Sequence, residues 1–307
     1  MWSSVWVRGA VSVAILAYLA SRIDMGAALD ALLQVDLRSL SVVLLLVGVD
    51  RIVMITRWLV VLRSSGHDTP VKSVAWIFLV SSFIGSALPA SIGGDAARAY
   101  TLARRTDDAS EAVASVAVDR LFGILSLAML AGIGASLWRT PLDLPVGLIQ
   151  LVAVLMVGTG ACLFWSDRWA RSLVPERWHG TRPGAALFDL ADALARYRRR
   201  GTALRSVLAL SVLVQLLRIS QAYLLGVGLG IDVSFAYYLL FMPIGLLMLL
   251  LPVSVAGFGL PQGVIVWLLR PQGIADSVSF ALSTLIVLTG LAGNLPGAWL
   301  YARRKER

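Results

Sequence analysis

Charge, histidine and cysteine are all scarce in this 307-residue sequence. Only 15% of the residues are charged, whereas a soluble domain carries about 25%. Hydrophobic residues make up 58% of the chain, and the mean hydropathy is +0.80. This composition excludes an ordinary water-soluble enzyme and indicates a protein whose solvent is a lipid bilayer.

The scarcity of cysteine and histidine also restricts the chemistry. Cys162 is the single cysteine, so a disulfide within the chain is excluded, and we expect this side chain to pack as a small apolar group. His67 and His179 lie far apart in predicted loops. No GxxxxGK[ST] motif is present, so ATP is not expected to drive the protein directly. We therefore predict no catalytic residue, no metal and no cofactor.

The charge that is present is mostly positive, with a formal net charge of +9. Nucleic acid is one partner that such a surplus suggests. In a membrane protein, however, basic residues gather in cytoplasmic loops, where they contact anionic headgroups. We accordingly expect anionic lipid headgroups as partners, and no nucleic acid.

Six apolar runs are long enough, or nearly so, to cross a bilayer. They comprise residues 5–21, 40–62, 112–137, 145–165, 203–229 and 277–301. Residues 5–21 are read as an uncleaved first helix, because bulky Tyr18 is a poor residue before a signal-peptide cleavage site. Two further apolar stretches, 71–88 and 235–251, end at proline and glycine. Each is predicted to enter the membrane, break and return.

The distribution of Arg and Lys supports six crossings and two re-entrant hairpins. With a cytoplasmic N-terminus, the cytoplasmic segments would carry eighteen basic residues and the opposite segments four. This bias follows the positive-inside rule. We therefore predict a multi-pass protein of the plasma (inner) membrane with both termini in the cytoplasm.

The same arrangement predicts two inverted halves within one transmembrane domain, residues 1–307. The first half would span residues 40–137 with a hairpin at 71–105, and the second residues 203–302 with a hairpin at 235–270. The two breaks resemble each other, reading LPASIGG at 88–94 and LPVSVAG at 251–257. Inverted repeats with broken helices near the midplane are typical of transporters. The predicted fold class is an all-α integral membrane protein with a pseudo-two-fold axis.

Between the halves lies a basic cytoplasmic linker, residues 166–202. Leu187, Leu190, Leu194 and Tyr197 recur at helical spacing within its part 185–200. We expect this amphipathic segment to lie on the anionic inner leaflet.

The first break is predicted to form a polar pocket at the cytoplasmic face. Ser91, Gly93 and Gly94 can open a turn whose free amides begin a short helix over residues 95–105. Non-helical backbone survives at membrane depth only where it is buried in protein or lines a cavity. The start of a helix carries partial positive charge, which suits a phosphate group.

Charged residues follow this break directly. Arg98, with Arg104 and Arg105 nearby, would add guanidinium groups that match phosphate oxygens. Asp95 is expected to cap the helix or to pair with an arginine. A capped loop in nonspecific contact with lipid is the alternative reading.

The second break is predicted to face the outside. It contains Ser254, Gly257 and Gly259 but no charged residue. The difference between the breaks suggests a site that binds charge at the cytoplasmic end and releases it at the other.

Charges within the apolar runs complete the predicted site, since such charges are costly and usually functional or paired. Arg57 and Arg218 are expected to line a central cavity, because each precedes its break by a similar interval. A structural ion pair of Arg57 with Asp119 or Asp50 is the alternative. Asp119 and Arg120 are also predicted at the site, although both could equally sit at headgroup level.

Four motifs carry a resemblance to a known family. They are LPASIGGDAARAY at 88–100, ASVAVDRLFGIL at 114–125, LRISQAYLLGVGLG at 217–230 and LPVSVAGFGLPQG at 251–263. In this order they resemble the membrane region of lysylphosphatidylglycerol synthase/flippases, over roughly residues 5–301.

This resemblance implies two pseudo-symmetric halves around a cavity that translocates lipid. Its implied site comprises Arg57, the 91–95 break with Arg98, Asp119 with Arg120, Arg218 and the 254–259 break. The 307 residues contain no counterpart of the cytosolic aminoacyl-transferase domain of the bifunctional members, so we expect no synthesis of lysyl-lipid.

We therefore expect a flippase-like transporter of an anionic or zwitterionic lipid, or of a polyprenyl-phosphate-linked lipid. Net movement would run from the inner to the outer leaflet. The alternatives are an integral membrane glycosyl or phosphoryl transferase and a scaffold for a partner synthase. A separate lipid-modifying enzyme is a candidate partner, and the sequence does not indicate an oligomeric state.

Overall fold

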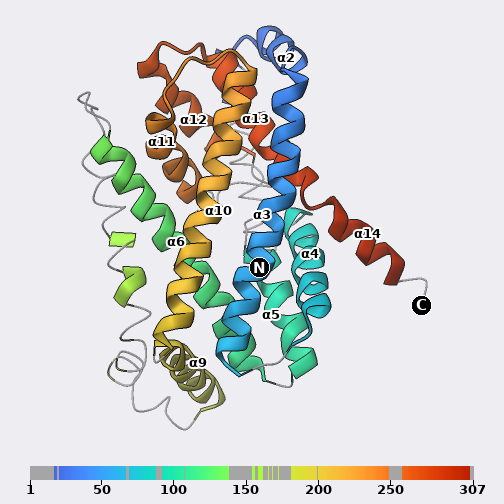
Figure 1. Ribbon diagram of the computed structural model, residues 1–307, viewed down its shortest axis with the longest axis vertical. Helices are drawn as coiled ribbons and strands as arrows, with labels where there is room; N and C mark the ends of the chain where they lie inside the picture. The colour runs from blue at the N-terminus through green and yellow to red at the C-terminus, as the bar shows by residue number, and fades with distance from the viewer. Residues whose placement is uncertain are drawn as a thin grey trace.

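The chain is built from helices throughout the residues that the computed structural model describes (Figure 1). These are residues 17–18, 21–66, 69–87, 92–106, 108–137, 154–155, 158–161, 165, 168, 172, 181–198, 200–248 and 258–304. The helices are α2 (Met25–Leu33), α3 (Leu37–Ser64), α4 (Val71–Ala87), α5 (Ile92–Thr106), α6 (Ala109–Leu137), α9 (Arg182–Arg198), α10 (Gly201–Gly228), α11 (Phe235–Met248), α12 (Leu260–Leu269), the 3₁₀ turn η1 (Arg270–Gln272), α13 (Asp276–Ala292) and α14 (Leu295–Arg304).

Four described helices are long and apolar enough to cross a membrane: Leu37–Ser64, Ala109–Leu137, Gly201–Gly228 and the combined α13–α14 segment Asp276–Arg303. They coincide with four of the six predicted runs, so the prediction of an all-α membrane protein is confirmed. The other two runs, 5–21 and 145–165, lie mostly outside the described residues.

Helices α3 and α10 form the centre of the bundle and pack against each other along their length (Figure 1). Each has 28 residues and is therefore about 42 Å long, which exceeds the ~30 Å hydrocarbon core of a bilayer. Asp36 caps the start of α3 by accepting a hydrogen bond from the Ser39 amide at 2.9 Å. The two helices are antiparallel, because Arg57 contacts Ser211 while the earlier Asp50 contacts the later Arg218.

Helices α4 and α5 form a short antiparallel pair at one end of the bundle. Arg105 near the end of α5 lies over the Trp76 ring near the start of α4, with 5.0 Å to the ring centroid. At the other end of the pair, a Cβ on Gly85 would lie 2.7 Å from the Gly94 Cα, so the two backbones nearly touch. With 17 and 15 residues, each helix is about half as long as α3. The connecting LPAS segment, 88–91, is outside the described residues.

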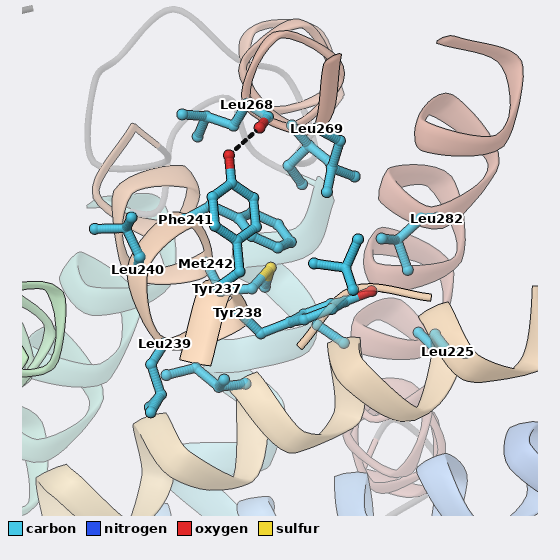
Figure 2. Packing of buried hydrophobic residues seen from close by; sticks show 14 of the residues in the cluster. Leu225, Tyr237, Tyr238, Leu239, Leu240, Phe241, Met242, Leu268, Leu269 and Leu282 are labelled. Carbon is cyan, nitrogen blue, oxygen red and sulfur yellow. Dashed lines mark hydrogen bonds between the residues drawn. The ribbon is translucent and has the colours of Figure 1, made fainter. Parts of the chain in front are cut away.

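Helices α11 and α12 form a second short pair at the opposite end of the bundle. The Tyr237 hydroxyl in the first turn of α11 donates a hydrogen bond to the Leu268 carbonyl near the end of α12 (Figure 2). Around it, Tyr238, Phe241 and Met242 pack with Leu282 of α13 in a large apolar cluster. The cluster fixes α11 and α12 against α10 and α13, and residues 249–257 between the pair are outside the described residues.

The two short pairs are held by the long helices through close backbone contacts. Helix α6 packs on α11 at Gly134, where a Cβ would lie 2.5 Å from the Leu240 nitrogen. Helix α14 packs on α4 at Gly297, where a Cβ would overlap the Leu79 carbonyl. Only glycine permits these approaches, so the contacts fix α11 against α6 and α4 against α14.

The last predicted span is not one uninterrupted helix. Helix α13 ends at Ala292, and α14 begins at Leu295 after a turn at Gly293 and Asn294, from which it runs away from the axis of α13 (Figure 1). The prediction of a single run over 277–301 missed this break. Its physical cause is Pro296, which has no N–H to donate to the Ala292 carbonyl and therefore disfavours a continuous helix.

Helix α9 in the linker packs on the bundle. Ala193 and Tyr197 are fully buried in a cluster with Trp58 and Ala112, while Leu187 is 41% exposed. Protein, rather than the expected lipid leaflet, therefore covers most of its apolar face. The Tyr197 hydroxyl donates to the buried carboxylate of Glu111, which Arg196 also contacts at 2.8 Å. Burial and this bond raise the pKa of the Tyr197 hydroxyl above its usual range.

Candidate functional site

A cavity of about 400 Å³ lies between α3, α4, α5, α6, α10, α11 and α13. Among the described residues, its charged lining consists of Arg51, Arg57, Arg98, Arg120, Arg218, Asp50, Asp95 and Asp119. Five guanidinium groups face three carboxylates, which leaves a surplus of two positive charges. Apolar side chains from α6, α10, α11 and α13 line the rest, including Leu127, Leu225, Met242, Leu246 and Ile286.

Asp119 joins three helices at one end of the cavity. Its Oδ1 accepts from Arg57 Nε of α3 at 2.7 Å, and its Oδ2 accepts from Arg98 Nη2 of α5 at 3.0 Å. Arg57 also donates to Ser211 Oγ of α10 at 3.2 Å. Asp119 is only 2% exposed, and such buried charges are tolerated where they are paired and hydrogen-bonded.

Asp95 extends this group, which we call the Asp119 group and define as Arg57, Arg98, Arg120, Asp95 and Asp119. Its carboxylate contacts Arg98 at 3.3 Å and also accepts from Arg120. The expected pairing of Asp95 with an arginine is confirmed. Its expected role as the residue that precedes the helix is wrong, because α5 already begins at Ile92 and places Asp95 within the first turn.

A second charged group, which we call the Asp50 group, comprises Asp50, Arg51 and Arg218. Asp50 contacts Arg218 at 3.3 Å and Arg51 at 3.7 Å. Arg51 Nη2 also donates to the Gly290 carbonyl in the last turn of α13 at 3.1 Å. Met54 lies beside this group, since its sulfur is 3.0 Å from Arg218 Nη2 and 3.7 Å from Arg51 Nη1.

The structure thus brings together most of the predicted site. Seven predicted residues line the cavity: Arg57, Gly94, Asp95, Arg98, Asp119, Arg120 and Arg218. The alternative for Arg57 is also realised, because Arg57 both lines the cavity and pairs with Asp119.

The remaining predicted residues lie elsewhere. Gly93 is in the first turn of α5, outside the described lining. Gly259 precedes α12 at a φ of 112°, and its amide donates to the fully buried Gln262 side chain at 2.6 Å. Ser91, Ser254 and Gly257 are outside the described residues. Arg104 and Arg105 are also absent from the described lining, and their guanidinium groups lie over the Tyr100 and Trp76 rings.

Several lining residues were not assigned to the site from the sequence. Asp50, Arg51 and Met54 share the face of α3 that carries Arg57, and this helical spacing was a signal that could have found them. Asn294 reaches the cavity because the α13–α14 break exposes it there, where its Nδ2 donates to Ser86 Oγ at 2.5 Å. That hydrogen bond between helices agrees with the usual role of a lone asparagine in a span.

Unpaired polar atoms remain around the cavity. Within the described part of the chain, Arg51 Nε, Arg98 Nε and Gln221 Nε2 are buried donors without a partner, and Gln215 Oε1 and Asn294 Oδ1 are buried acceptors without one. Buried polar atoms are normally hydrogen-bonded, to protein or to ordered water. The lining can therefore receive a polar group that both donates and accepts hydrogen bonds.

Among the described residues, His, Cys, Asp and Glu form no cluster of three or more that could hold a metal ion. The arginine, aspartate and amide side chains of the lining offer charge binding and hydrogen bonding. The cavity thus combines a surplus of arginine with apolar surface, between helices of membrane-spanning length.

Comparison with known proteins supports the assignment to a membrane protein. No curated protein matched the chain. A family model for the lysylphosphatidylglycerol synthase TM region matches residues 5–297, which is nearly the whole sequence. The chain is a multi-pass membrane protein and belongs to the family of the lysylphosphatidylglycerol synthase transmembrane region.

Proposed function

We propose that the protein is a flippase that moves a lipid with an anionic or zwitterionic headgroup from the inner to the outer leaflet. Phospholipids and polyprenyl-phosphate-linked lipids both have such headgroups. The observation that carries the proposal is the cavity, whose wall combines five arginines with apolar side chains. A headgroup can occupy the charged part while the tails stay in the bilayer.

The transport reading rests on an inverted repeat of the helices α3–α6 and α10–α14. Two contacts between α3 and α10 support it: Arg57 donates to Ser211, and Arg218 donates to Asp50. The same sequence offset relates Arg57 to Arg218 and Asp50 to Ser211. A two-fold axis through the middle of the helix pair would relate one contact to the other in this way.

The outer helices support the same repeat. Helix α6, which ends the first set, packs its Gly134 on α11, the first short helix of the second set. Helix α14, which ends the second set, packs its Gly297 on α4, the first short helix of the first set. In both cases the last helix of one set packs on the first short helix of the other set. A two-fold axis between the sets would produce such a reciprocal pair of contacts.

Six crossings with two re-entrant hairpins and cytoplasmic termini remain the proposed topology, in the plasma membrane. The short lengths of α4, α5, α11 and α12 support hairpins that enter only part of the bilayer. The bias of arginine and lysine supports the orientation.

Reconstitution tests the proposal. Purified protein would be placed in vesicles that contain headgroup-labelled fluorescent phosphatidylglycerol, phosphatidylcholine or a polyprenyl-phosphate sugar, and a membrane-impermeant quencher would be added outside. We expect the quenched fraction of at least one anionic or zwitterionic lipid to rise above that in protein-free vesicles.

The outcome that contradicts the proposal is equally direct. Quenching identical to protein-free vesicles for all three lipids would reject a flippase of these lipid classes. Mass spectrometry of the same vesicles would reveal a new lipid species if the protein were instead a lipid-modifying enzyme.

A further inference from the structure

The two charged groups of the cavity lie at different depths. Seven residues separate Asp50 from Arg57 on α3, and seven separate Ser211 from Arg218 on α10. The contact of Arg57 with Ser211 and that of Arg218 with Asp50 are therefore about two helical turns apart, or about 10 Å along the helices. Because both helices are of membrane-spanning length, this separation is one of depth in the bilayer.

Each group has the same excess charge. In the Asp119 group three arginines face two carboxylates, and in the Asp50 group two arginines face one. Each therefore retains one positive charge that its own carboxylates do not neutralise. An anion with one negative charge would therefore neutralise the excess charge of either group.

Each group also retains a hydrogen-bond donor for such an anion. Arg98 Nε in the Asp119 group and Arg51 Nε in the Asp50 group are buried and have no partner among the described residues. Charge-assisted hydrogen bonds from guanidinium to phosphate are among the strongest available in a protein. Both arginines line the cavity, so a turn of either side chain would present its unpaired donor to a phosphate oxygen.

Met54 lies between the groups on α3, one turn from Arg57 and one turn from Asp50. Its sulfur is a weak acceptor that carries no charge and can be displaced by a phosphate oxygen. Its unbranched side chain adapts to irregular space. No opposing charge is therefore placed on this turn of α3.

We propose that these groups are two anion subsites, occupied in turn by the phosphate of one lipid headgroup. The phosphate first contacts Arg57 and Arg98, then moves about 10 Å to Arg51 and Arg218. When the phosphate is at the other subsite, Asp119 and Asp50 stay paired with their arginines, and the vacated group keeps its one excess positive charge. Because the excess charge is equal, neither subsite binds the headgroup so much more tightly that it cannot leave. Channels with several binding sites have the same requirement. This inference rests on the proposed function.

Two single substitutions test it, because each leaves the remaining charges paired one to one. Arg98→Gln leaves Arg57 with Asp119 and Arg120 with Asp95, and Arg51→Gln leaves Arg218 with Asp50. Neither variant strands a buried carboxylate, so both are expected to fold. Arg270→Gln, which removes an exposed arginine paired with Asp276, is the matched control.

Binding of dihexanoyl phosphatidylglycerol to the purified full chain in detergent would be measured by calorimetric titration. If the ligand occupies either subsite, loss of one subsite weakens binding only about twofold. The Arg98→Gln/Arg51→Gln double variant should bind about 10- to 100-fold more weakly. One single variant that binds as weakly as the double variant would overturn the inference, as would a double variant that binds like the wild type.

Two further measurements separate the possible failures. In the vesicle assay both single variants should flip phosphatidylglycerol at least about tenfold more slowly than Arg270→Gln. Single variants that flip phosphatidylglycerol at the wild-type rate would overturn the movement of the phosphate between the subsites. If the wild-type protein flips no lipid but the predicted binding pattern is observed, the proposed function is rejected and the two subsites are retained. Inorganic phosphate is titrated in parallel, and binding as tight as that of the lipid would overturn the assignment to a headgroup.

Discussion

Removal of the Asp119 carboxylate is the sharpest test of how the cavity is held together. In the Asp119→Ala variant, Arg57 would lose its carboxylate and keep its hydrogen bond to Ser211, and the nearest carboxylate to Arg98 would be that of Asp95 at 3.3 Å. Both guanidinium groups lie in side chains that are only 5% exposed. Breaking a buried pair by removing one partner costs about 3–5 kcal/mol, because the remaining charge is left uncompensated.

Alanine substitutions of two other aspartates provide a comparison for the expected loss of unfolding free energy. Asp50→Ala should cost about 1–3 kcal/mol, since its partners are further away, at 3.3 and 3.7 Å, and their side chains are 29% and 16% exposed. Asp276→Ala removes a pair whose arginine side chain is 57% exposed and should cost about 0–1 kcal/mol. The expected order of destabilisation is Asp119 first, Asp50 second and Asp276 last.

Reversible unfolding in mixed detergent and SDS micelles, followed by tryptophan fluorescence, would measure the three differences in free energy of unfolding. A loss for Asp119→Ala below about 1 kcal/mol, equal to that of Asp276→Ala, would refute the reasoning. It would mean that water reaches both arginines and replaces the carboxylate. The Asp119 group would then be a hydrated surface of the cavity rather than a buried junction of three helices.

Three further predictions concern transport, topology and packing. Arg57→Ala and Arg218→Ala should each lower the rate of lipid flipping at least about tenfold. Membrane insertion should be retained, because Asp119 and Asp50 each keep a second arginine. A normal flipping rate in both variants would exclude both arginines from the mechanism. For the topology, the native cysteine is replaced by serine and single cysteines are introduced. A cysteine in place of Asp232 should react with an impermeant maleimide from outside, and one in place of Arg200 only after permeabilisation. The reverse labelling pattern would show that the orientation in the membrane is opposite to the proposed one. Gly297→Val should lower the thermal unfolding temperature, since its side chain would overlap the Leu79 carbonyl of α4; an unchanged temperature would show that this approach is not close.

Much of the fold could be predicted because the signal is local. The runs at 40–62 and 203–229 agree with α3 and α10 to within a few residues, since unbroken apolar sequence has to become helix inside a bilayer. The break at Gly293 and Asn294 was missed because Pro296 stands alone in an otherwise apolar run.

The pairing of the site residues was harder to predict, because it depends on the register between helices distant in sequence. Arg57 was expected to meet either Asp119 or Asp50, and the sequence alone does not say which. The structure assigns Asp50 to Arg218, since α3 and α10 are antiparallel with a fixed offset, and it assigns Asp119 to Arg57 through the packing of α6 on α3. Arg51 was overlooked as a site residue because its contact with the Gly290 carbonyl depends on where α13 ends.

The position of Met54 also makes the cavity accessible to spectroscopy. The chain has seven methionines, so isotopic labelling of methionine methyl groups would yield a sparse spectrum even for a protein in a micelle. The methyl group of Met54 adjoins a sulfur that two guanidinium groups contact, and its chemical shift should respond when an oxyanion takes that place. One resonance, identified by Met54→Leu, would thus report occupancy without any dye attached to the lipid.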